Sequence, residues 1–376
     1  MNDFAKSALL PNGLRDILPL DAAHEAEVVD QVCTHFAAQG YERVKPPLME
    51  FEETLLDGIG GATTRHCFRV MDPLTQRMMA VRADMTPQVS RIARTRLAGA
   101  PRPLRLSYAG QVLRVKGSQL RPERQFGQAG IELIGADCPE ADAEVAVLAA
   151  EALVSLGLAG ISIDLSLPTL VPAVLAGLGL PEETLRDPLN HKDAAAVAAL
   201  GGLAAPLLSA LLLSAGPVDR ALSMLSGLNL PAAAAVERDR LAQVAALIAQ
   251  ALPEVAITVD PVENRGFEYH TGIAFTLFSR TIAGELGRGG RYLAGGVEAA
   301  TGATLFLDTV LAGLPSAPQA RRLFVPAGTA RQMAQALRAQ GWITVAGLQA
   351  VADNAAEARR MECGHWLAAD GVTSVE

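Results

Sequence analysis

Residues 104–135 have the sequence LRLSYAGQVLRVKGSQLRPERQFGQAGIELIG, which decides the expected fold. Residues 104–115 and 126–134 are strand-like, and the segment between them is a polar loop. Gln128 and Glu132 are four residues apart in the second strand. Because side chains alternate along a strand, both are expected on the same face. A solvent-facing strand edge would show the same spacing, so the pattern alone leaves a pocket and an exposed edge open.

The residues before this pair of strands predict two helices, a strand and a hairpin. Asp21 is expected to cap a helix over residues 22–39, and Gly40 stands where a left-handed residue commonly ends a helix. The plain interpretation of Arg91, Arg94 and Arg96 is a solvated helix end. The other expected elements are a strand over 41–44, two strands over 68–71 and 78–82 joined through Asp72 and Pro73, and a helix over 88–97.

The residues after residue 135 predict further strands separated by a long helical insertion. Pro139 is expected to open a helix that ends near Gly157. The Ala/Leu-rich segment 168–253 has helical texture and is taken as an inserted helical subdomain. Gly287, Gly289 and Gly290 are expected to form a glycine-rich turn. The remaining elements are strands over 161–165, 256–260 and 272–278, and then a strand over 323–325, a helix over 330–340, a strand over 342–346 and a further helical piece.

The composition indicates a compact globular protein of two or three domains. The chain has 376 residues, of which 50% are hydrophobic, 19% charged and 4% aromatic. The core is therefore expected to consist mainly of Ala, Leu and Val, as in helices packed on sheets. The net charge is −8. Since nucleic-acid affinity depends largely on Lys and Arg, an acidic chain is a poor general tRNA binder.

The cysteines and the N-terminus indicate a reducing compartment. The cysteines have no paired short spacing, so neither a zinc site nor a disulfide framework is expected, and we interpret them as reduced, mostly buried thiols: Cys33, Cys67, Cys138 and Cys363. The first residues lack the apolar stretch of a signal peptide, so the cytoplasm is the expected location. Residues 194–218 carry no charge, but Gly201, Gly202 and Pro206 interrupt them, which favours short buried helices over a membrane span.

Separated segments covering most of residues 10–312 resemble histidyl-tRNA synthetase in order and spacing. Residues 40–50 (GYERVKPPLME) are similar to the dimer-interface motif of class II synthetases. Residues 81–88 (VRADMTPQ) are similar to the loop whose acid and threonine face the amino group of the bound amino acid, here Asp84 and Thr86. The resemblance therefore implies a homodimeric core and an amino-acid pocket.

The other matching segments complete the pocket. Arg114, followed by the RQFGQ segment and Glu132, is similar to the synthetase strand pair that holds the substrate histidine. Residues 264–272 (NRGFEYHTG) and 289–292 (GGRY) are similar to signatures of histidine-handling members, although His270 replaces a tyrosine. The histidine pocket that the resemblance implies consists of Asp84, Thr86, Arg114, Gln128, Glu132, Arg265, Tyr269, His270, Gly289, Gly290, Arg291 and Tyr292.

Two positions depart from the synthetase pattern where a synthetase handles ATP. Lys116 replaces a glutamate at the adenine end of ATP, and Thr309 replaces the arginine that clamps the γ-phosphate. A short neutral side chain cannot supply that bidentate charge. Because adenylate formation depends on electrostatic stabilisation of phosphate displacement, the two changes should cost several kcal/mol of transition-state stabilisation. We therefore expect a pocket that binds an amino acid without activating it.

This combination is similar to the family of regulatory subunits of the short-form ATP phosphoribosyltransferase, the first enzyme of histidine biosynthesis. The resemblance implies a non-catalytic subunit without cofactor or metal. It further implies that the subunit activates a short catalytic partner in a hetero-octamer of four copies of each and transmits feedback inhibition by histidine. The alternatives are an active histidyl-tRNA synthetase and a synthetase-derived tRNA-sensing or ligase module.

The expected fold is α+β, with a class II synthetase-like antiparallel sheet flanked by helices. The expected parts are a core over residues 1–167 and 255–316, a helical insertion over 168–254 and a truncated α/β unit over 317–376. Simpler structural roles remain open for three of the pocket positions. Arg265 would suit a surface ion pair, His270 a hydrogen-bonded structural imidazole, and the glycines at 289 and 290 a hairpin turn.

Overall fold

The chain divides into two compact units, Met1–Pro315 and Ser316–Glu376. The computed structural model describes the residues 9–57, 64–117, 122–179, 185, 187–189, 191–200, 202–263, 269–315 and 320–375. The expected α+β class with a largely antiparallel sheet flanked by helices is confirmed.

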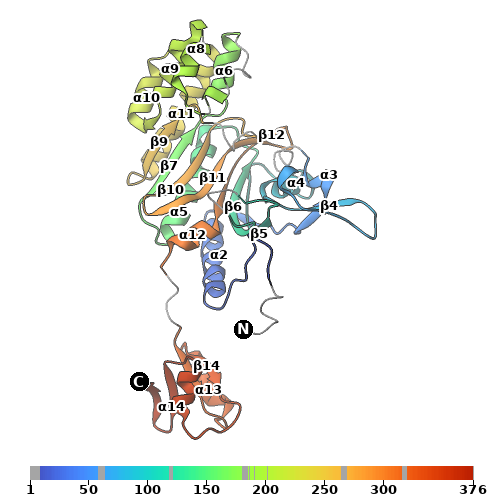
Figure 1. The fold of residues 1–376 in the computed structure, drawn as a ribbon, viewed down its shortest axis with the longest axis vertical. Coiled ribbons are helices and arrows are strands. Elements are labelled where there is room, and N and C mark those ends of the chain that lie inside the picture. Colours follow the sequence, from blue (N-terminus) through green and yellow to red (C-terminus); the bar gives the residue numbers. More distant parts are fainter. Residues whose placement is uncertain are drawn as a thin grey trace. The chain divides into compact units, whose positions relative to one another are not determined.

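The first unit is built on one large sheet. Its strands are β1 (Glu42–Arg43), β5 (Leu104–Leu113), β6 (Gln125–Ile134), β7 (Ile161–Ser166), β8 (Gly216–Pro217), β9 (Ala256–Asp260), β10 (Ala274–Ser279), β11 (Ile282–Ala294) and β12 (Glu298–Phe306). Their order is β1-β5-β6-β12-β11-β10-β7-β9-β8 (Figure 1). The pairs β1–β5 and β7–β9 are parallel, and the other neighbouring pairs are antiparallel. The two long strands predicted from residues 104–135 are thus confirmed as the antiparallel pair β5–β6.

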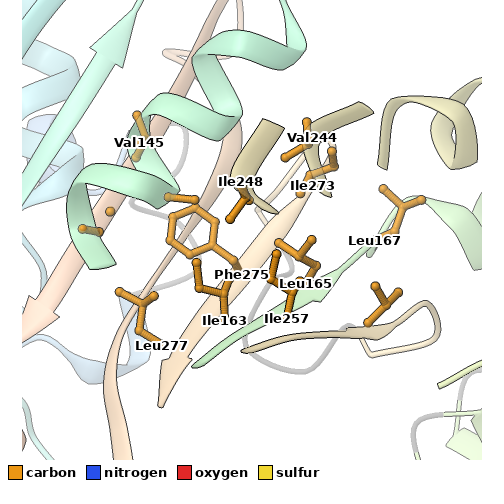
Figure 2. Packing of buried hydrophobic residues seen from close by; sticks show 14 of the residues in the cluster. Val145, Ile163, Leu165, Leu167, Val244, Ile248, Ile257, Ile273, Phe275 and Leu277 are labelled. Carbon is orange, nitrogen blue, oxygen red and sulfur yellow. The ribbon is translucent and has the colours of Figure 1, made fainter. Parts of the chain in front are cut away.

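One face of this sheet is covered by α5 (Pro139–Ser155) and α11 (Ala232–Ala251). Residues of β7 alternate, so that Ile163 and Leu165 enter the core while Asp164 points to the other face and accepts a hydrogen bond from Thr258 at 2.6 Å. Figure 2 shows Val244 and Ile248 of α11 packed near these strand residues. Each fully buried aliphatic side chain contributes about 1.5–3 kcal/mol, so this face holds the unit together.

The helical insertion is a set of short helices joined to the sheet by α11. Its other elements are α6 (Leu170–Gly177), α8 (Ala194–Leu200), the 3₁₀ turn η2 (Gly202–Ala204), α9 (Ala205–Leu213) and α10 (Val218–Ser226), which gather at the β7 and β9 end of the sheet (Figure 1). The uncharged run 194–218 forms short helices, as predicted, but they are not fully buried, because most described residues of α8 are exposed and α9 buries Leu208 and Leu211. Among the described residues, no helix is both long and apolar enough to cross a membrane.

The opposite face of the sheet carries α4 (Thr86–Thr95), and a small antiparallel sheet lies beside it. That sheet has the order β2-β4-β3 and consists of β2 (Met49–Phe51), β3 (Arg69–Met71) and β4 (Met78–Val81). The hairpin predicted around Asp72 is confirmed. Arg91 is not merely a solvated helix end, because its Nε and Nη2 donate to the buried Glu50 carboxylate at 2.8 and 2.5 Å.

The first helix among the described residues, α2 (Asp21–Ala38), begins differently from the prediction. The short helices α3 (Glu52–Leu55) and α12 (Leu307–Gly313) also belong to this unit. Asp21 is the first helical residue and not the cap, because Leu20 precedes the helix at φ 77° without a side-chain cap bond. Asp21 instead places its charge in the first turn, where the helix dipole favours an acid. Gly40 has φ 83°, which confirms the left-handed residue expected after the helix.

The expected glycine-rich turn at residues 287–290 is wrong. Gly287, Gly289 and Gly290 lie inside β11, paired with β10 on one side and β12 on the other. A Cβ at Gly289 would lie 2.3 Å from the Gly302 carbonyl oxygen and 2.4 Å from the Phe275 ring. These glycines therefore permit a close approach of neighbouring strands, which a local turn pattern does not reveal.

The second unit is a small α/β layer. Its elements are β13 (Arg322–Val325), α13 (Arg331–Ala339), β14 (Ile343–Ala346), α14 (Asn354–Arg360), β15 (His365–Ala368) and β16 (Gly371–Ser374), with the strand order β14-β13-β15-β16. The predicted strand, helix, strand and helix are confirmed, whereas β15 and β16 were not foreseen. Asp353 caps α14 by accepting from the backbone N–H groups of Ala355 and Ala356 at 2.9 Å.

The structure has free thiols, as expected, at Cys33, Cys67, Cys138 and Cys363. Cys138 is half-buried and the other three are buried.

Candidate functional site

A cavity of about 180 Å³ lies on the face of the large sheet that carries α4. Cross-strand register explains how residues distant in sequence reach it. Glu132 on β6 pairs with Gly302 on β12, which pairs with Gly290 on β11. Two residues away from Gly302 and Gly290 along the same strands, Thr304 on β12 pairs with Arg288 on β11. The residues that line the cavity are His66, Ala83, Asp84, Thr86, Arg114, Glu132, Tyr269, Arg288, Gly289, Gly290, Tyr292, Gly302, Thr304 and Phe306.

Glu132 is the buried acid at the base of this cavity. Its side chain is fully buried, and it accepts hydrogen bonds from the hydroxyls of Thr86 at 2.8 Å, Tyr108 at 3.3 Å and Tyr292 at 2.8 Å. Burial raises the pKa of Glu132 to about 8, because desolvation of the charged form outweighs these hydrogen bonds. Burial and the charge of Glu132 also raise the pKa values of Tyr108 and Tyr292 well above the ordinary tyrosine range.

Two glycines that line the cavity permit close contacts with neighbouring groups. A Cβ at Gly302 would lie 1.9 Å from Glu132 Oε2, and a Cβ at Gly290 would lie 2.6 Å from His270 Cδ2. The carboxylate therefore fits only because the neighbouring strand has no side chain at that position. Gly302 was not predicted as a site residue, because a glycine in a strand carries no chemical signal of its own.

The loop before α4 places a second acid at the cavity. Asp84 accepts from the Thr86 backbone N–H at 2.9 Å and from Gln128 Nε2 at 3.2 Å. Gln128 also accepts from the Met85 N–H at 3.2 Å. Gln128 is fully buried on the same strand face as Glu132, which confirms the predicted shared face, but it does not line the cavity. It positions the loop that carries Asp84.

The other side of the cavity is cationic. The guanidinium carbon of Arg114 lies 5.0 Å from the centre of the Phe126 ring, and that of Arg288 lies 5.6 Å from the centre of the Phe306 ring. The two rings meet edge to face with centroids 6.3 Å apart. Arg114 also donates to the Ala83 carbonyl at 3.3 Å. Arg288 was not among the predicted site residues, and its only signal in the sequence was its position directly before the two glycines.

The segment around residue 270 contributes one lining residue among those described. Tyr269 lines the cavity, and its ring lies 4.1 Å from the His270 ring at an angle of 30°. His270 is buried behind Gly290 and does not line the cavity. Arg265 lies outside the residues that the structure describes.

Arg291 points away from the cavity, unlike its neighbours Gly290 and Tyr292. Its Nε donates to Asp142 Oδ2 at 3.1 Å, and its Nη2 contacts Asp142 Oδ1 at 2.9 Å. A strand places successive residues on opposite faces of the sheet. Arg291 therefore faces α5, whereas Gly290 and Tyr292 face the cavity. Arg291 therefore holds the pocket strand to α5 and does not touch a ligand in the cavity.

The two positions that we expect to depart from the synthetase pattern, Lys116 and Thr309, also lie outside the cavity lining. Lys116 is exposed, in an open groove beside the N-terminal segment with Gly13, Arg15 and Arg124. Thr309 is in α12, where its Cγ2 lies 3.7 Å from a Cβ built at Gly284 of β11. The unpredicted lining residues are His66, Ala83, Arg288, Gly302, Thr304 and Phe306.

Comparisons with known proteins give one consistent group of relatives. Residues 13–310 match the family model described as histidyl-tRNA synthetase. The chain is 64% identical over the full length of both proteins to a protein of Paramagnetospirillum magneticum named ATP phosphoribosyltransferase regulatory subunit. It is 56% identical to a protein of the same name from Rhodospirillum centenum, over 98% of this chain and 97% of that protein.

Solved structures agree on the fold. A structure from Bacillus halodurans titled as an ATP phosphoribosyltransferase regulatory subunit/histidyl-tRNA synthetase superposes with a TM-score of 0.82 at 23% identity, covering 94% of this chain and 96% of that one. A histidyl-tRNA synthetase from Nostoc superposes with a TM-score of 0.79 at 17% identity, covering 96% of this chain and 92% of that one. At these identities the likeness concerns the fold alone.

Proposed function

The chain belongs to the family of ATP phosphoribosyltransferase regulatory subunits. From that premise we propose that the chain binds free histidine and that this binding causes feedback inhibition of a catalytic partner. In this proposal the subunit is non-catalytic, is required for activity of the catalytic partner and acts in the first step of histidine biosynthesis. Linkage requires histidine to bind the inhibited arrangement of the complex more tightly than the active one.

The observation that carries the proposal is a small cavity with an acidic base and a cationic side. Its volume of about 180 Å³ is below the roughly 300–1,000 Å³ of sites for drug-sized ligands, which favours a single amino acid over an aminoacyl-adenylate. Asp84 and Glu132 suit the ammonium or imidazole end of an amino acid. Arg114 and Arg288 suit a carboxylate.

The proposal that the subunit does not activate amino acids rests on Lys116 and Thr309. In-line attack on the α-phosphate of ATP needs cations fixed where negative charge develops. Thr309 offers a hydroxyl and no charge at the position where the synthetase pattern has an arginine, and Lys116 reverses the charge of a glutamate. The neutral threonine cannot reproduce a guanidinium fork.

We further propose how the subunit assembles. Residues 40–50 contribute to a homodimeric core, and the dimers join a short-form catalytic subunit in a hetero-octamer with four copies of each, in the cytoplasm. The net charge of −8 opposes general tRNA binding, so tRNA is not expected among the partners.

Reconstitution with a short-form catalytic subunit tests the proposal. Mixing should raise transferase turnover and make it sensitive to histidine. The Glu132→Ala variant should retain the activation but lose the histidine sensitivity, whereas Glu254→Gln, at an exposed acid, should behave as the unmodified protein. Unchanged turnover in the mixture would refute the assignment.

Two further assays address the alternative functions. Histidine-dependent ATP–pyrophosphate exchange by the purified chain would identify an active synthetase. Retained tRNA binding in a gel shift at moderate salt would favour a tRNA-sensing module. Neither signal is expected from this chain.

A further inference from the structure

We infer that Arg288 recognises the carboxylate of the cavity's amino-acid ligand, with Glu132 at the ligand's cationic end. This inference rests on the proposed function, because it takes histidine as the ligand. It adds a specificity-determining residue that neither the sequence pattern nor the family resemblance singled out.

The first support is the placement of the two charged groups on one face of the sheet. Glu132, Gly302 and Gly290 form one row across β6, β12 and β11, and Gly130, Thr304 and Arg288 form the next row. The two rows are separated by two residues along a strand, which is about 7 Å. Glu132 and Arg288 are also two strands apart, with β12 between them, which adds about 9–10 Å across the sheet. A free amino acid lying diagonally across these strands can therefore place its cationic end at Glu132 and its carboxylate towards Arg288.

The second support is the different surroundings of the two ends. Among the described residues, the groups that hydrogen-bond to Glu132 are the hydroxyls of Thr86, Tyr108 and Tyr292, none of which carries a positive charge. A cationic ligand would supply the charge that stabilises the ionised carboxylate. Gly302 lets the Glu132 carboxylate occupy this position at the cavity, because a Cβ there would lie 1.9 Å from Glu132 Oε2.

The third support is the way Arg288 is held. Its Nη2 donates to Glu285 Oε2, three residues away on the same strand, and its guanidinium lies above the Phe306 ring. A guanidinium has five N–H donors, so the contact that orients Arg288 is compatible with a second contact to a ligand. The side chain is 30% exposed and lines the cavity. The Arg288 guanidinium is thus held in one orientation and is still accessible to a ligand in the cavity.

The neighbouring arginines have different placements. Arg291 faces the other side of the sheet and binds Asp142. Arg114 lines the cavity and is tied to the Ala83 carbonyl of the Asp84 loop. Arg288 is the guanidinium in the described cavity lining that comes from the same strand as Gly290, two strands away from Glu132.

Calorimetric titration with histidine and with histamine, which lacks the carboxylate, tests this role. The unmodified protein should bind histidine about 10- to 100-fold more tightly than histamine, the range expected for a charged hydrogen-bonding pair. In Arg288→Gln, histidine affinity should fall by that factor while histamine affinity stays the same. Arg288→Lys should lie between, because lysine keeps the charge without the planar fork.

Matched variants make the outcomes separable. Arg360→Gln, at an exposed arginine, should leave both affinities unchanged. Two outcomes with an unmodified protein that binds histidine would show that the inference is wrong while the proposed function stands. In the first, Arg288→Gln keeps the preference for histidine over histamine. In the second, Arg288→Gln loses affinity for both ligands equally while Arg288→Lys behaves as the unmodified protein. Displacement of histidine by inorganic phosphate through Arg288 would reassign this arginine to phosphate and overturn the inference. If the unmodified protein does not bind histidine, the proposed ligand fails together with this role.

Discussion

Two acids, Glu132 and Asp142, are buried against opposite faces of the same strands, and their hydrogen-bond partners differ in charge. Glu132 accepts hydrogen bonds from hydroxyls of described residues. Asp142 accepts from the guanidiniums of Arg291 and Arg240 and from the Thr301 hydroxyl at 2.6 Å. The exposed fraction is 0% for Glu132 and 2% for Asp142. Burial alone therefore does not distinguish them.

The difference shows which acid belongs to the fold and which is available to a ligand. The charge of Asp142 is compensated by arginines from β11 and from α11 of the insertion, so it fastens three parts of the unit together. Burial without such a cation raises the pKa of Glu132 to about 8. A buried acid of this kind stabilises the fold poorly when ionised and is suited to binding a cation.

The largest expected effect is on the Asp142 side. Asp142→Ala leaves two guanidiniums without their buried partner and should lower the free energy of unfolding by about 3–5 kcal/mol. Urea denaturation measures this change. Asp137→Ala is the matched control, because Asp137 contacts the same two arginines but its side chain is 68% exposed. The control should cost less than about 1 kcal/mol. Equal losses in the two variants would remove the distinction between the faces.

The next largest effect concerns ligand affinity on the Glu132 side. Glu132→Gln keeps the size of the side chain but not its charge, so histidine binding should weaken by about 2–3 kcal/mol, or roughly 30- to 150-fold. The free energy of unfolding of the ligand-free variant at pH 7 should not fall. Titration calorimetry and denaturation together measure both. A variant that unfolds more easily and binds histidine normally would reverse the two assignments.

A smaller effect is expected from the glycine beside Glu132. Gly302→Ala places a methyl group where Glu132 Oε2 lies, so the carboxylate must shift, at a cost of about 1–3 kcal/mol in unfolding free energy and with loss of histidine binding. Gly99→Ala is the control, because a Cβ there meets nothing within 4 Å. Thermal denaturation and calorimetry check both variants. Normal binding by Gly302→Ala would place the ligand elsewhere.

The last effect, which is the smallest when taken per pH unit, is a pH dependence of stability. The ordinary pKa of Glu132 is 4.5 and its pKa in the fold is about 8, so between these values the folded chain holds a proton that the unfolded chain has lost. The stabilising contribution is complete below pH 4.5 and is lost as the pH rises towards 8. In this window the unmodified protein should lose about 1 kcal/mol per pH unit relative to Glu132→Gln, or about 2 °C in Tm. Parallel Tm profiles of the two proteins from pH 5 to about 8.5 would mean that Glu132 is ionised throughout.

Much of this organisation could be anticipated from local sequence patterns. The paired strands over residues 104–135, the helix ending before Gly40 and the hairpin around Asp72 follow from periodicity and turn residues. The resemblance of separated segments then predicted the fold. The glycines at 287–290 were misinterpreted as a turn, because their role depends on strands that pair with them from elsewhere in the chain.

The sequence by itself determined most of the elements, the fold and the kinds of residue available for a site. Only the tertiary structure decided which of them meet. Arg288 and Arg291 are three positions apart on one strand, and the side-chain alternation sends Arg288 to the cavity and Arg291 to Asp142. A shift of one residue in register would exchange these faces. Register is fixed by packing of the whole sheet against its helices, which no local stretch of sequence contains.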